Sequence, residues 1–84
     1  MTKGVRQFQT LRDLRDRRGL SQSVVAQRLR ITQPQVVKWE HGRAEPQESN
    51  KWALAELYGV TIDEIAAAIL ATKQAHMSTT SDDE

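Results

Sequence analysis

The sequence predicts a small all-α domain made of five short helices. Its 84 residues suit one domain with a modest core, and no second domain to close over a catalytic cleft is expected. No stretch alternates apolar and polar residues in the manner of a strand, and no Asn-Gly or Asp-Gly hairpin turn occurs. Apolar residues instead recur at helical spacing between residues that typically begin or end helices.

The first helix is expected to end at Gly19, although its start is open. Thr10 with Asp13 fits an N-terminal cap, but the apolar pattern could begin as early as Val5. The residues that mark its buried face, spaced by three, are Phe8, Leu11 and Leu14.

Two helices follow in close succession. Ser21 caps one that runs to about Leu29, and Thr32 begins the next. Gln35 stands three residues after Thr32, which predicts a capping box, and Pro34 suits the first turn. The apolar residues of the pair are Val25, Ala26, Leu29, Val36 and Trp39, and Gly42 closes the second helix.

Two more helices are expected after a loop over 43–47. The first carries Trp52, Leu54, Ala55, Leu57 and Tyr58 and stops at Gly59. The second opens with a capping box of Thr61 and Glu64 and carries Ile62, Ile65, Ala66 and Ile69. Residues 73–84 are polar, acidic and poor in apolar residues, so we expect a disordered tail there.

The charge is divided unevenly along the chain. Ten Lys and Arg residues stand against three acids through Arg43, whereas two stand against eight from Ala44 onward. A basic half of this kind favours a polyanionic partner. On charge alone, a solvated surface with accidental clustering is an equally good explanation.

Several classes of function are excluded. The chain has no cysteine for a disulfide or thiolate site, and its two histidines, His41 and His76, are too few for a metal site. No serine–histidine–acid set, carboxylate pair or phosphate-binding glycine loop is present, so we expect neither an enzyme nor a cofactor. No 18-residue apolar run or apolar N-terminal stretch occurs, which predicts a cytoplasmic protein without membrane contact.

Residues of about 22–41 predict a helix-turn-helix motif. Only Arg30, Ile31 and Thr32 separate two short helices, so the chain must turn sharply. The small side chain of Ala26 lets the two helices approach closely, and the outer face of the second helix is polar.

The same region resembles the phage Cro/repressor family of XRE-type regulators. The matching positions are Leu20-Ser21-Gln22, Ala26, Leu29, Ile31-Thr32-Gln33, Val36 and Trp39-Glu40-His41-Gly42, flanked by residues 11–19 and 54–65. The resemblance covers roughly residues 8–70. It implies a compact five-helix lambda-repressor-like DNA-binding domain over 8–72, preceded by a flexible segment over 1–7. The implied function is that of a dimeric repressor that inserts its third helix in the major groove of double-stranded DNA.

The chain departs from the family pattern in three ways. Arg30 replaces the usual glycine of the turn, so either Arg30 is left-handed or the turn differs. Val24 stands where the family usually has the acid that completes a capping box at the start of the second helix, so that box is missing. The fourth helix has Glu48 and Lys51 at positions where leucines are common in the family.

The resemblance also implies which residues contact DNA. Base contacts fall on Gln33, Pro34, Val37 and Lys38, and phosphate contacts fall on Gln22, His41 and Arg43. Gln33 can bond an adenine edge, Lys38 a guanine or a phosphate, and Val37 a thymine methyl. Solvated side chains are the alternative, and Gln35 is expected in the capping box instead.

Two further pairings follow from the resemblance. Arg15 and Glu40 match a salt bridge between the first and third helices, the alternative being two exposed charges. A homodimer interface is expected over about 60–72, formed by Ile65, Ile69 and Leu70, because this helix carries few charges after Glu64. The alternative is a monomer that pairs only on DNA.

The alternative function is an antitoxin or restriction–modification controller whose C-terminal half binds a partner protein.

Overall fold

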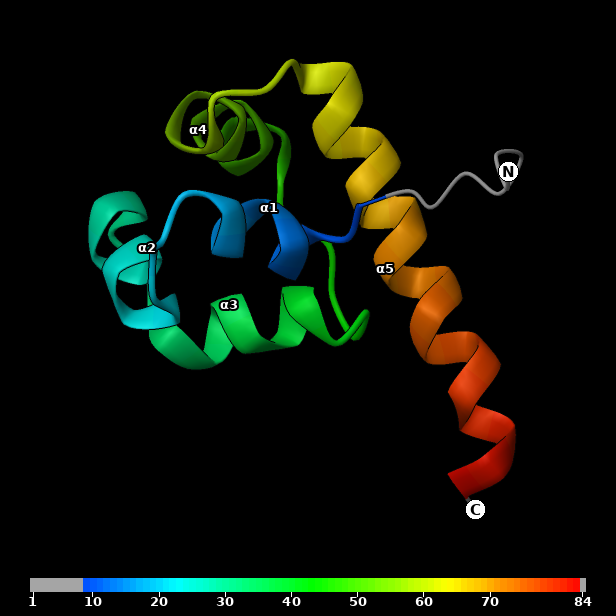
Figure 1. The fold of residues 1–84 in the computed structure, drawn as a ribbon. Helices are drawn as coiled ribbons and strands as arrows, with labels where there is room; N and C mark the ends of the chain where they lie inside the picture. Colours follow the sequence, from blue (N-terminus) through cyan, green and yellow to red (C-terminus); the bar gives the residue numbers. More distant parts are fainter. Residues whose placement is uncertain (1–8, 84) are drawn as a thin grey trace.

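The computed structural model describes residues 9–83 and holds five α-helices and no strand over that range (Figure 1). The helices are α1 (Leu11–Arg17), α2 (Gln22–Leu29), α3 (Gln33–Glu40), α4 (Glu48–Tyr58) and α5 (Ile62–Asp83). Helix α1 lies in the middle, and the other four surround it (Figure 1). The predicted all-α class is therefore confirmed. The flexible segment expected over 1–7 lies outside the described residues.

Side-chain caps explain where three of the helices begin. The Thr10 hydroxyl accepts the Asp13 backbone N–H at 3.2 Å, and the Asp13 carboxylate accepts the Thr10 N–H at 3.0 Å. Thr61 and Glu64 make the same reciprocal pair, and Ser21 accepts the N–H three residues on at 3.1 Å. Helix α1 begins directly after its cap rather than further upstream.

The prediction of a capping box at the start of α3 is wrong. The Thr32 side chain makes no capping hydrogen bond, and the Gln35 backbone N–H donates instead to the Thr32 carbonyl at 3.1 Å. Pro34 has no N–H to satisfy, so the first turn needs little help from side chains. The Gln35 side chain is consequently exposed.

The turn between α2 and α3 keeps its tight geometry despite the missing glycine. Arg30 adopts a left-handed conformation with φ 61° and ψ 45°. The next N–H, of Ile31, donates to the Ala26 carbonyl at 2.9 Å and closes the turn. Arg30 therefore takes the glycine's conformation, at a steric cost of about 1 kcal/mol.

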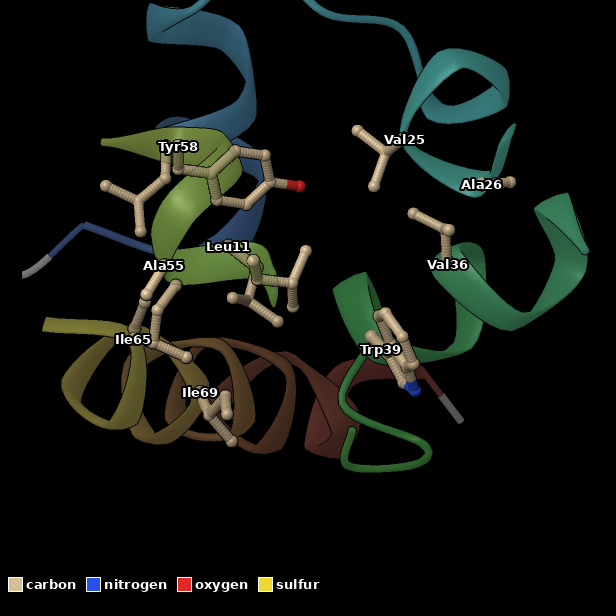
Figure 2. Packing of buried hydrophobic residues seen from close by; sticks show 12 residues of the cluster. Leu11, Val25, Ala26, Val36, Trp39, Ala55, Tyr58, Ile65 and Ile69 are labelled. Carbon is tan, nitrogen blue, oxygen red and sulfur yellow. The ribbon is translucent and has the colours of Figure 1, made fainter. Parts of the chain in front are cut away.

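One apolar core joins all five helices (Figure 2). Its buried members are Leu11, Leu14, Val25, Ala26, Val36, Trp39, Leu54, Ala55, Tyr58, Ile65, Ala68 and Ile69. Ile65 and Ile69 are 0% and 7% exposed, so their assignment to a dimer surface is wrong: α5 turns them inward. Leu70, in contrast, is 55% exposed.

Helix α5 continues to Asp83, where a disordered tail was expected from residue 73. The buried Thr72 hydroxyl accepts the Leu11 backbone N–H at 3.0 Å and donates to the Ala68 carbonyl at 2.8 Å. Lys73 then pairs with Glu45 of the loop before α4. These bonds join α5 to the start of α1 and to the loop before α4, and the alanines of α5 favour helix.

Candidate nucleic-acid interface

Helix α3 has one side buried in the core and an opposite side that is largely exposed. Val36 and Trp39 point into the core and are at most 3% exposed. The four residues expected to contact bases are together on the other side: Gln33, Pro34 and Lys38 are exposed and Val37 is half-buried. Gln35, which was expected in a capping box, is also exposed. The packing of α3 therefore leaves a short polar ridge available to a ligand.

A chain of hydrogen bonds fixes the start of this ridge. The Gln33 side-chain amide donates to the Gln22 Oε1 at 3.4 Å. The Gln22 Nε2 in turn donates to Glu40 Oε1 at 3.0 Å. Gln22, expected at a phosphate, is thus half-buried between the first residue of α3 and its last.

The expected salt bridge between Arg15 and Glu40 is present and buried. The Arg15 Nε and Nη2 atoms donate to the two Glu40 oxygens at 2.6 and 3.0 Å. Arg15 Nη1 donates further to the Leu20 carbonyl at 3.0 Å. The two residues are 9% and 6% exposed, and the hydrogen bond to Glu40 raises the pKa of Arg15 above its usual value. Through these bonds Arg15 links α1, and the segment between α1 and α2, to the C-terminal end of α3.

His41 and Arg43 lie exposed just after α3, where phosphate contacts were expected. The Arg43 backbone N–H donates to the Lys38 carbonyl at 2.9 Å, so the chain stays close to the helix end. The His41 ring faces His76 of α5, with 5.4 Å between ring centroids. No local pattern in the sequence indicated this neighbour, because His76 lies where a disordered tail was expected.

Other site chemistries find little support in the described part of the chain. Among those residues, no three His, Cys, Asp or Glu side chains gather closely enough to hold a metal ion. None of the described helices is long and apolar enough to cross a membrane. The candidate site is the exposed outer face of α3 with the residues that flank it.

Comparison with known proteins identifies this region independently. A family model described as helix-turn-helix matches residues 11–65, which is 55 of the 84 residues. The matched range includes Arg15, the α2–α3 turn, the outer face of α3 and the start of α5. No curated protein and no solved structure matches the chain.

Proposed function

The chain belongs to the helix-turn-helix family of Cro/repressor (XRE) type, whose members bind DNA and regulate transcription, and on this premise we propose that it is a dimeric repressor. In the proposed complex, α3 enters the major groove of double-stranded DNA with its N-terminal residues at the base edges. The genes it controls are then silenced by occupation of their operator.

The outer face of α3 carries this proposal. Gln33, Pro34 and Lys38 are exposed together while the opposite side of the same helix is locked in the core. A glutamine amide can make two hydrogen bonds to adenine, and a lysine ammonium can donate to guanine. The Gln33 amide nitrogen lies 3.4 Å from the Gln22 Oε1, at the start of the exposed face.

Phosphate contacts are proposed at the two edges of this face. His41 and Arg43 follow the C-terminal end of α3, and Gln22 stands at the first position of α2. Backbone contacts of this kind fix the register of a protein on the duplex but do not read its sequence. The basic first half of the chain supplies the long-range attraction.

The dimer is proposed to form through the exposed side of α5 around Leu70. Leu70 and Trp52 are the large apolar side chains that remain more than half exposed among the described residues. Exposed apolar side chains of this size favour a contact surface. A second subunit would place a second α3 at a half-site about one helical turn away, which a symmetric operator requires.

A salt titration of duplex binding tests the proposal. The full chain should bind a mixed-sequence 20-base-pair duplex at low salt. If a dimer neutralises roughly six to ten phosphates, affinity should fall about 10³- to 10⁵-fold between 50 and 200 mM salt. Absence of duplex binding at low salt would contradict the proposed function.

A further inference from the structure

An open groove lies between α2 and α4, beside the turn that follows α1. It has a volume of about 520 Å³, which is within the usual range of ligand-binding pockets. The side chains that line it include Arg18, Leu20, Arg28, Leu29, Glu56 and Leu57. The three leucines are half-buried and pack against the core, so they give the groove an apolar floor. The three charged residues are exposed.

The groove is on a different side of the domain from the outer face of α3. Helices α3 and α4 lie on opposite sides of α1 (Figure 1). Val36 and Trp39 turn the inner side of α3 toward the core that α4 also joins (Figure 2), so the outer face of α3 points away from α4. A duplex bound to that outer face therefore leaves the groove open to a second partner.

The groove carries two arginines whose charge is not neutralised by an ion pair. Among the described residues, neither Arg18 nor Arg28 forms an ion pair or a side-chain hydrogen bond, whereas Arg12 and Arg15 of α1 have carboxylate partners. Glu56 is the one acid in the lining. Two guanidinium groups against one carboxylate give the lining a net positive charge, which favours an anionic ligand.

Arg18 lies across the end of α4. A Cβ atom on Gly59 would lie 3.4 Å from the Arg18 Nη1 and 3.7 Å from its Cζ. Helix α4 has no basic residue in its own last turn, so the Arg18 guanidinium supplies the positive charge that a helix C-terminus favours. The side chain nevertheless remains exposed. Arg18 is therefore positioned by α4 and accessible to a ligand.

We propose that this groove binds an acidic segment of a partner protein, in which carboxylates flank a large apolar side chain. The carboxylates pair with Arg18 and Arg28, because a planar guanidinium can bond both oxygens of a carboxylate. The apolar side chain covers Leu20, Leu29 and Leu57 and displaces water from them. A nucleic-acid strand would match the charge of the groove but has no aliphatic side chain for its floor. The inference adds a protein partner, at a separate surface, to the proposed DNA-binding function.

Selection from a library of random peptides of about 12 residues, with the full chain as the target, tests the inference. The recovered peptides should share acids on both sides of a Leu, Ile or Phe. A fluorescein-labelled peptide with the recovered motif then gives affinities by fluorescence anisotropy. Arg18→Gln and Arg28→Gln should each weaken its binding by about threefold to fivefold at low salt, and by less at high salt. The matched control, Arg17→Gln, removes the same charge from an exposed position outside the groove and should bind as the parent does.

Several outcomes would overturn the inference. A library that yields no enriched peptides, or yields peptides without acids, would exclude an acidic segment as the ligand. Equal peptide affinities for the parent and both groove variants would place the peptide elsewhere. If Arg28→Gln makes the salt slope of binding to the mixed-sequence duplex shallower by about 0.9 for each subunit, Arg28 contacts a DNA phosphate instead. If the same variant converts a dimer to a monomer in sedimentation, the groove belongs to the contact between two copies of the chain. Peptide binding is measured without DNA, so its result does not depend on the outcome of the duplex titration.

Discussion

The Arg15 guanidinium and the Glu40 carboxylate form two hydrogen bonds, of 2.6 and 3.0 Å, across the interface between α1 and α3. Glu40 also accepts a bond from Gln22, and Gln22 accepts one from Gln33. One buried carboxylate thus orients residues at both ends of α3. The orientation of the proposed base-reading helix depends on this ion pair.

Removing Arg15 should destabilise the fold strongly. Arg15→Ala leaves the Glu40 carboxylate buried without its counter-ion, which costs on the order of 3–5 kcal/mol. Arg17, an exposed arginine of the same helix, is the matched control, and Arg17→Ala should cost well under about 1 kcal/mol. Urea unfolding of both variants measures the difference. Equal transition midpoints would show that the ion pair contributes no more than a surface charge.

Replacing Arg30 by glycine should stabilise the protein. Glycine adopts the observed φ of 61° without the steric cost that arginine bears, so we expect a gain of up to about 1 kcal/mol. For a domain of this size the melting temperature should rise by about 4–8 °C per kcal/mol. Gly59→Ala, at a φ of 71°, should move it in the opposite direction. A lower melting temperature for Arg30→Gly would mean that the Arg30 side chain makes a stabilising contact.

Base reading and phosphate contact should separate on mutation. Gln33→Ala should flatten the preference at one base position in each half-site, at a cost of about 1–3 kcal/mol for the preferred base. Arg43→Ala should weaken binding to all sequences alike and make the salt slope shallower by about 1 for each subunit of the dimer. Competition with single-base variants of a bound duplex distinguishes these effects. An unchanged base preference in Gln33→Ala would exclude Gln33 from readout.

The dimer proposal predicts that a charge at Leu70 separates the subunits. Leu70 is exposed, so Leu70→Glu should leave the fold and its circular dichroism intact while converting dimer to monomer in sedimentation. Leu70→Met keeps an apolar side chain and should remain dimeric. A dimer that persists in Leu70→Glu would place the interface elsewhere, with the neighbourhood of Trp52 as the next candidate.

Local signals in the sequence predicted most of the fold correctly. Thr10, Ser21 and Thr61 cap the helices that they were expected to cap, because side-chain capping depends on residues only three apart. The side chain of Thr32 does not cap its helix as expected, because the Thr32 backbone carbonyl accepts the Gln35 N–H in its place. That choice depends on the geometry of the α2–α3 turn, which residue type alone does not specify.

Long-range packing explains the other differences. The side of α5 that faces the core was misjudged because Ala68 and Thr72 are buried with Ile65 and Ile69, and small or polar residues give a weak periodic signal. His76 reaches His41 only because α5 continues past residue 73 and packs on the loop. Contacts between residues 35 positions apart leave no local pattern in a single sequence.

Selection of bound duplexes from a random-sequence DNA pool tests the central claim most directly. If α3 reads bases as one half of a symmetric dimer, the selected sequences should share a motif of two inverted half-sites, about 10 base pairs apart from centre to centre. The same selection with Gln33→Ala should lose information at one position of each half-site. A pool that stays unenriched, or a motif that Gln33→Ala leaves unchanged, would contradict sequence-specific recognition by α3.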